Sequence, residues 1–201
     1  MIANARCIAA ALALSAPLAT PAVAATWSDT FLGYRYGTQF HEPNNTKDVR
    51  KHVLQFTHAS GYSLGQNFVN MDVLQSDKND PISGGDSGAT EFYLTYRHQL
   101  HMSKVFERSF ANGVVRDLAL TAGFDLNTKN TRFAPRKRLL VVGPTIKFDV
   151  PGFLDLSLLA GKEWNHCGLG APACPEPSIA FDPQLILSAA WGIPFQAGPL
   201  P

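Results

Sequence analysis

The chain has 201 residues, which is enough for one domain and too few for two of ordinary size. Its 17 basic and 16 acidic residues nearly balance, so no basic face marks nucleic acid as a partner. Charged residues make up only 16% of the chain, where about a quarter is usual for a soluble domain. No apolar run of about 18 residues follows residue 25, which excludes membrane-spanning helices.

Residues 1–25 have the pattern of a secretory signal peptide. Arg6 precedes a small, apolar run at 7–14, and Ala-Val-Ala at 22–24 resembles an A-x-A cleavage site. The segment is too short, and too interrupted by two prolines, to be a membrane helix. The sequence therefore predicts an exported protein whose folded part is residues 26–201.

Eight later segments alternate between apolar and polar residues with the period of two that marks a β-strand. In the first of them Leu32, Tyr34, Tyr36 and Phe40 share one face, and Arg35 lies on the other. The segments are residues 29–40, 51–60, 66–76, 91–100, 117–127, 139–149, 154–164 and 182–193. Each is roughly 10–13 residues long, the length that a tilted strand needs to cross a membrane, whereas strands in soluble sheets usually have about 5–6. We therefore expect an all-β fold, an antiparallel transmembrane β-barrel of the outer membrane.

The connections between these segments also alternate, in length. Short ones are expected at 60–65 and at 150–153, where Val-Pro-Gly-Phe fits a type II turn. Long polar ones are expected at 41–50, 77–90, 128–138 and 165–181. Long external loops and short periplasmic turns are typical of bacterial barrels.

Two places depart from this regular pattern. The connection at 101–116 is long where a short turn is expected, and its Phe106, Phe110 and Val114 predict a small periplasmic helix. Pro144 lies in the middle of a strand, where it removes a hydrogen-bond donor, so we expect a bulge beside Gly143.

A soluble barrel also alternates, with its apolar face turned inward. Its outer face would normally be rich in Lys and Glu, whereas the polar positions here are mostly Gly, Ser, Thr, Asn and Gln. Aromatic residues also fall toward the ends of segments, as an interfacial girdle requires: Tyr34, Tyr36, Phe40, Trp164 and Trp191. Both features favour the membrane barrel.

No motif in the chain points to an enzyme. A G-x-S-x-G motif, a P-loop and an H-E-x-x-H motif are all missing from the sequence, and the six histidines are scattered. His98 and His101 are three apart, which places them on opposite faces of a strand and disfavours a metal site. We expect no catalytic residues, no cofactor and no metal.

Polar residues on the inward face are the candidates for a solute path. Facing charges of both signs across a narrow lumen can pair and hold the barrel shape, or bind the hydroxyls and base edges of a polar solute. The alternation turns nine of them inward: Arg35, Asn70, Asp72, Glu91, Arg97, Asp125, Lys147, Asp155 and Glu163.

Two predicted external loops carry further features. Cys167 and Cys174 lie in the short segment CGLGAPAC, which outside the cytoplasm predicts a disulfide, and a metal site is the alternative. A basic loop could meet lipopolysaccharide phosphates or simply be solvated: Arg132, Arg136, Lys137 and Arg138.

Several strings resemble the "outer envelope protein" branch of the nucleoside-specific channel-forming (Tsx-type) family. They are THASGY at 57–62, LTAGFDLNTKN at 120–130, VVGPTIKFDVPGFLDLSLL at 141–159 and AAWGIPF at 189–195, together with Trp-Ser-Asp at 27–29. The resemblance implies an outer-membrane barrel that passes nucleosides. It carries over no solute-contacting residue.

The resemblance also implies twelve strands, whereas this chain supplies about eight and ends in FQAGPLP without a final amphipathic strand. We therefore expect a member that lacks its C-terminal strands, or a small closed barrel without a pore. An unclosed sheet would leave two unpaired edges in lipid, which is not viable.

Three functions are consistent with these observations. The first is an outer-membrane channel for passive uptake of nucleosides or similar small polar solutes. The second is a non-conducting outer-membrane barrel with a structural or adhesive role, and the third is a soluble periplasmic barrel that binds a ligand. The first implies contact with outer-membrane lipid and lipopolysaccharide, and insertion by the barrel assembly machinery.

Overall fold

The structure of the chain is a computed structural model, and it describes residues 25–194. The predicted signal peptide lies almost wholly outside the described residues. Within them the fold is all-β, with one helix of four residues. No helix in this part of the chain is both long and apolar enough to span a membrane.

Eight long strands form where the alternating segments predict them, most of them longer by one or two residues at one or both ends, whereas the last is shorter at both ends. They are β1 (Trp27–Phe40), β2 (Val49–Tyr62), β3 (Gly65–Ser76), β4 (Thr90–His101), β5 (Val115–Lys129), β6 (Arg138–Phe148), β7 (Phe153–His166) and β9 (Gln184–Gly192). A ninth, β8 (Ser178–Ala180), was not predicted and lies in the expected loop at 165–181. The expected strands and their order are thus confirmed.

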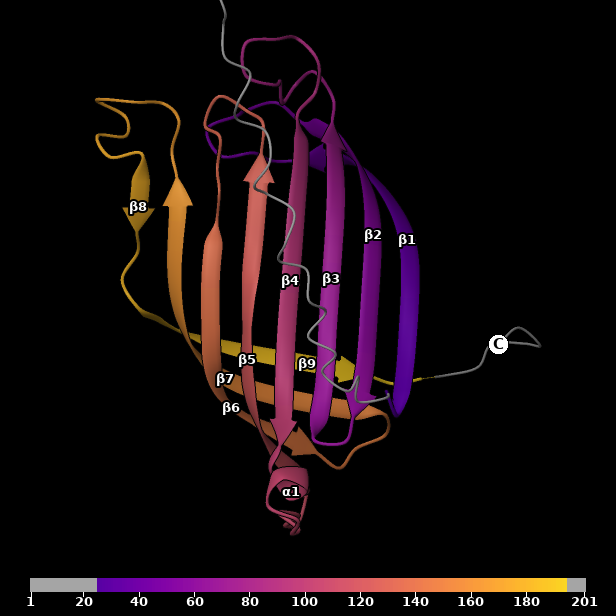
Figure 1. Cartoon of the computed structure of the whole chain (residues 1–201). Helices are drawn as coiled ribbons and strands as arrows, with labels where there is room; N and C mark the ends of the chain where they lie inside the picture. The colour runs from indigo at the N-terminus through magenta and orange to yellow at the C-terminus, as the bar shows by residue number, and fades with distance from the viewer. Residues whose placement is uncertain (1–24, 195–201) are drawn as a thin grey trace, which may run out of the picture.

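The strands form a single antiparallel sheet in which, from β1 to β8, each strand pairs with the next along the chain. The last long strand, β9, pairs with the first part of β7 (Phe153 to Gly161), and short β8 pairs with its final three residues. Figure 1 shows the sheet curling, so that β6, β7 and β9 sweep across beneath β1 to β5. The sheet therefore has one concave and one convex face.

The sheet is not closed into a barrel. In the part of the chain that the structure describes, β1 pairs only with β2, and β9 pairs only with β7. The expectation of a closed barrel is therefore not met by these residues, because no strand joins the free edge of β1 to the free edge of β9.

The connections lie at two opposite ends of the sheet (Figure 1). The four long ones gather at one end, which we call the loop end. The tight turns after β2 and β6 and the segment with α1 (Met102–Val105) lie at the other, the helix end. Gly152 has a φ of 78°, the left-handed value that a type II turn requires at its third position.

The connection after β4 contains a small helix, as the sequence predicts, but α1 ends before Phe106, so the apolar residues expected to build it lie outside it. No bulge forms at Pro144: the pairing of β6 with β7 is interrupted at Gly143 and Pro144 but resumes in the same register, because a missing donor breaks one rung without inserting a residue. Bulges form instead near the end of β1 and at the start of β5.

That bulge in β1 turns Phe40 to the concave face. The register shifts between Gly37 and Phe40, which pairs with Val49, and one extra residue exchanges the two faces. The ring of Phe40 accordingly lies 5.5 Å from the ammonium group of Lys51, on the concave side. Phe40 therefore does not belong with Tyr34 and Tyr36, as the simple alternation predicts.

Candidate functional site

The two faces of the sheet differ sharply in chemistry. Convex positions carry large apolar side chains open to the surroundings, among them Leu32 and Leu185, each 76% exposed. Concave positions carry the polar and charged residues, and the small buried core, Leu139, Val141 and Leu159, lies on this face at β6 and β7. An exposed apolar surface of this kind is typical of faces that contact another protein, a ligand or a membrane.

All nine residues predicted to face a lumen lie on the concave face. Paired residues of neighbouring strands share a face, and the registers connect the nine positions into one set: Arg35, Asn70, Asp72, Glu91, Arg97, Asp125, Lys147, Asp155 and Glu163. Each charged member has an ionic partner, and Asn70 accepts hydrogen bonds from Gln55 and Thr57.

The ion pairs link neighbouring or next-neighbouring strands. Arg35 donates to Asp72 at 3.0 Å, from β1 to β3. Arg97 donates to Asp125 at 2.7 Å, from β4 to β5. Such pairs connect strands across the concave face and neutralise most of its charges. This is the structural role that the sequence predicts for these residues as the alternative to solute binding.

A cluster of five charged residues, the loop latch, ties two loops to the sheet at the loop end. Its members are Glu42, Lys51, Asp80, Glu91 and Lys129. Lys51 lies 2.5 Å from Glu42, and Lys129 lies 2.8 Å from Asp80. Both lysines are almost fully buried, and Glu42 and Asp80 come from the connections after β1 and β3. The latch thus fixes those two loops over the end of the concave face.

The sequence identifies only Glu91 among the latch residues. Lys51 is the first residue of the expected segment at 51–60, but it is not among the residues selected there; Lys129 lies two residues beyond the expected limit of 117–127, so a longer strand would have included it. Glu42 and Asp80 lie in loops, where periodicity carries no information about direction.

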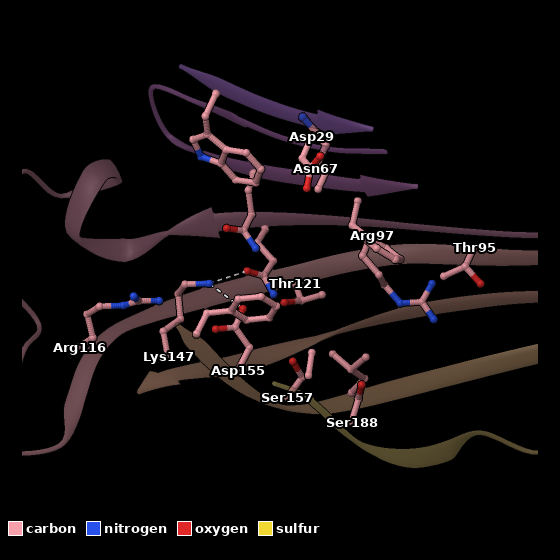
Figure 2. A pocket seen from close by; sticks show the side chains of 18 residues that line it. Asp29, Asn67, Thr95, Arg97, Arg116, Thr121, Lys147, Asp155, Ser157 and Ser188 are labelled. Atoms are coloured by element: carbon pink, nitrogen blue, oxygen red, sulfur yellow. Dashed lines mark hydrogen bonds and ion pairs between the residues drawn. The ribbon is translucent and has the colours of Figure 1, made fainter. Parts of the chain in front are cut away.

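A cavity of about 580 Å³ opens on the concave face at the helix end (Figure 2). All eight long strands contribute residues to its lining, from Trp27 of β1 to Ala190 of β9. Three of the nine predicted residues belong to its wall, namely Arg97, Lys147 and Asp155. Arg116, the extra residue of a bulge in β5, lines it as well. The other six predicted residues lie outside the cavity.

The polar wall of the cavity centres on a buried ion pair. Lys147 donates to Asp155 Oδ2 at 2.6 Å and to Gln99 Oε1 at 3.0 Å. A row of hydroxyl groups continues beside it, since Thr145 shares hydrogen bonds with Thr121 at 2.5 Å and with Ser157 at 2.7 Å. The ion pair and the hydroxyl row present donors and acceptors side by side.

The apolar wall of the cavity includes three aromatic rings, two of which lie beside glycines. A side chain on Gly61 would collide with the indole of Trp27, and one on Gly192 would collide with the ring of Phe153. Both rings line the cavity, together with Phe68. The glycines thus leave the space that these two rings occupy.

The remaining candidate residues lie at the loop end. Cys167 and Cys174 are joined by a disulfide with their Cα atoms 6.1 Å apart. Of the basic loop, Lys137 turns inward, where it donates to Tyr93 and lies 3.7 Å from Glu163. Burial lowers the pKa of Lys137, but Tyr93, Glu163 and Asp125 together outweigh it, so the pKa is raised above its ordinary value.

Neither a metal site nor a similarity to known proteins identifies a function for these features. Within residues 25–194 no group of three or more His, Cys, Asp or Glu side chains is arranged to hold a metal ion. Comparison of the chain with family models, with curated proteins and with solved structures finds no significant match.

Proposed function

We propose that this protein lies in the outer membrane and provides a passive path for small polar solutes, with nucleosides as the class that the resemblance suggests. One observation carries the proposal. Eight long strands present exposed apolar side chains on the convex face and paired charges on the concave face. The function needs no cofactor and no making or breaking of bonds.

The dimensions of the strands support a membrane location. A strand of 12 residues such as β3 extends about 40 Å, which after a tilt of about 45° covers a hydrocarbon layer about 30 Å thick. Convex residues at mid-strand, such as Leu54 and Leu140, are more than half exposed. In lipid these side chains would lie in an apolar surrounding.

The distribution of polarity also distinguishes the membrane proposal from a soluble ligand-binding barrel. A soluble barrel places apolar side chains inside and charges outside. Here the buried charges, among them Lys147 and Asp155, lie on the concave side. Recovery of the protein in the soluble periplasmic fraction without detergent would favour the soluble function instead.

A membrane location requires that the edges of β1 and β9 be covered. An unpaired backbone group in hydrocarbon costs several kcal/mol, and each edge has a row of them. Eight strands that close on themselves leave an interior filled by side chains, whereas about 16 leave an aqueous channel. The proposed path thus depends on how the edges are paired in the membrane.

Single-channel conductance in planar bilayers tests the function. The refolded protein, titrated with adenosine and thymidine, is expected to give discrete steps that the nucleosides block in a saturable way. The variant Lys147→Met, which removes a charge from the cavity wall, should change the concentration at half block. Inserted protein without steps contradicts the path and favours a non-conducting structural or adhesive barrel, whose working parts would be the loops after β3 and β7.

A further inference from the structure

We infer that the convex face binds one phosphate-bearing lipid at the loop end, with a phosphate group on Arg138 and an acyl chain along the apolar side chains beside it. The inference rests on the proposed membrane location and deepens it, because it names the lipid chemistry that the protein selects. It does not depend on whether solutes pass through the protein.

A hollow of about 530 Å³ lies on the convex face where β5, β6 and β7 approach the loop end (Figure 1). We call it the lipid groove, and its convex lining is Phe124, Leu126, Arg138, Leu140 and Trp164. The registers place Leu126, Arg138 and Trp164 side by side on the three strands, and Phe124 opposite Leu140 two residues further from the loops. A cation thus stands at the loop side of an apolar hollow.

The apolar surface continues along β6 toward the middle of the sheet. Leu140 and Val142 follow Arg138 on the same face, and their exposed fractions are 55% and 49%. A hydrocarbon chain laid along these side chains would remove them from water, which is favourable in proportion to the apolar area covered. The direction from Arg138 to Val142 is therefore the direction of the acyl chain.

A second arginine lies beside Arg138 on the same face. Two backbone hydrogen bonds from β5 to the carbonyl groups of Pro135 and Lys137 continue the pairing of β5 with β6 beyond Arg138. Side chains alternate along such a ladder, and Lys137 points to the concave face, where it lies 3.7 Å from Glu163. Arg136 therefore shares the convex face with Arg138, and both side chains are exposed.

Lys162 adds a third cation at the edge of the groove. It stands opposite Leu140, and its ammonium group lies 6.0 Å from the centre of the Trp164 ring. It donates one hydrogen bond, to the carbonyl of Phe181 at 2.6 Å, and an ammonium group has three N–H donors. Donor capacity is therefore left for a phosphate oxygen.

The charges of this surface are not neutralised by the protein. In the described part of the chain Arg136, Arg138 and Lys162 form no ion pair. The acidic residues of the neighbouring connection, Glu176 and Asp182, do not pair with them either. The groove thus presents three positive charges to a ligand.

A lipid with phosphate monoester groups is the complement of this surface. Its phosphate oxygens accept charge-assisted hydrogen bonds from a guanidinium group, two at a time from one arginine. A zwitterionic headgroup brings a cation of its own, which the three cations repel. A soluble phosphate has no chain to cover Leu140 and Val142, so the apolar half of the groove favours a lipid.

Native mass spectrometry of the purified full chain in dodecyl maltoside micelles tests the inference. The protein is titrated with diphosphoryl lipid A, and in parallel with phosphatidylcholine. One molecule of diphosphoryl lipid A is expected to bind saturably and at least about tenfold more tightly than phosphatidylcholine. Inorganic phosphate in large molar excess should not displace it.

Two pairs of variants connect the binding to the named residues. Arg138→Gln should weaken the binding of diphosphoryl lipid A about tenfold, whereas Arg108→Gln should leave it unchanged. Arg108 is the matched control, because it is also exposed and lies 4.7 Å from an aromatic ring, that of Phe110, but at the helix end. Leu140→Asn should weaken binding as well, and Leu158→Asn, on a convex position of similar exposure outside the groove, should not.

Equal affinity for the two lipids would mean that the convex face takes any lipid, and displacement by inorganic phosphate would mean a site for free anions. Either result overturns the inference, as does an equal affinity in Arg138→Gln and Arg108→Gln. The titration measures no conductance, so a protein that selects the lipid but conducts nothing refutes only the solute path. A conducting protein without the lipid preference refutes only the lipid groove.

Discussion

Lys147 and Asp155 stand directly opposite each other on β6 and β7, and their charged groups are 2.6 Å apart with both side chains about 95% buried. Removal of one member leaves the other as an unpaired buried charge. We expect Lys147→Met to lower the free energy of unfolding by about 3–5 kcal/mol. Urea unfolding in detergent measures it.

The exposed pair of Arg35 and Asp72 provides the matched comparison for that variant. The Arg35 side chain is 56% exposed, so Arg35→Met should cost less than about 1 kcal/mol. An equal decrease in the free energy of unfolding in Lys147→Met and Arg35→Met would mean that burial does not determine the strength of the ion pairs on the concave face.

The loop latch predicts how firmly the loops are held. Lys129 lies between the carboxylates of Glu42 and Asp80, so Lys129→Met leaves three carboxylates with Lys51 alone. The repulsion should release the connections after β1 and β3, and limited proteolysis with mass spectrometry should find faster cleavage there. Arg50→Met, which removes the exposed pair with Asp77, is the control and should cleave at the wild-type rate. Identical cleavage in both variants would contradict the latch.

Lys137 predicts a dependence of stability on high pH. Its pKa in the folded protein is raised above the unfolded value of about 10.5, so the protonated form is favoured by folding. The contribution to stability is fully present below about pH 10.5 and is lost as the pH rises through the folded pKa. The difference in urea midpoint between wild type and Lys137→Met should therefore shrink above that pH. A difference in urea midpoint that stays constant to about pH 12 would show that the raised pKa of Lys137 does not contribute to stability.

Gly61 and Trp27 predict a coupled pair of substitutions. A valine at position 61 would push the indole out of its place, so Gly61→Val should destabilise the protein by about 1–3 kcal/mol and shift the tryptophan emission. In a Trp27→Ala background the same substitution should cost much less, because the collision is gone. A double-mutant cycle measures the coupling, and additive losses would show that the ring does not need the glycine.

The free edges predict a cross-link in the membrane. Leu32 of β1 and Leu187 of β9 lie on the convex face of the two edge strands and are each over 70% exposed. If the edges are covered after insertion, the double variant Leu32→Cys/Leu187→Cys should be joined by a flexible bis-maleimide in bilayers. A link within one chain identifies pairing of its own edges, and a link between chains identifies a neighbouring copy. Two thiols that stay unlinked and reactive in inserted protein would contradict covered edges.

The strands could be predicted because their residues alternate with period two over more than ten positions. The same alternation gave the concave direction of Arg35, Lys147 and Asp155, since direction within a regular strand follows from residue number alone. It failed at Phe40, where the bulge inserts one residue and reverses the faces. Nothing in the residues next to Phe40 marks that insertion.

The contents of the cavity could not be predicted, because they depend on the curl of the sheet. Trp27 and Ala190 are far apart in sequence and lie on strands that do not pair, yet they line one cavity. Periodicity gives the face of each residue but not which positions on distant strands approach each other. Asp155 was identified as inward-facing, while its unsatisfied oxygen became visible only with its neighbours in place.

The number of long strands has a consequence for how the sheet can be extended. Eight strands that alternate in direction leave β1 and β9 running in opposite directions, so the two edges are antiparallel partners for each other. Any bridge between them that preserves antiparallel pairing must contain an even number of strands, and zero, two or a second set of eight all satisfy this parity. The edge of β1 in one sheet can therefore pair in antiparallel fashion with the edge of β9, in the same chain or in a second copy.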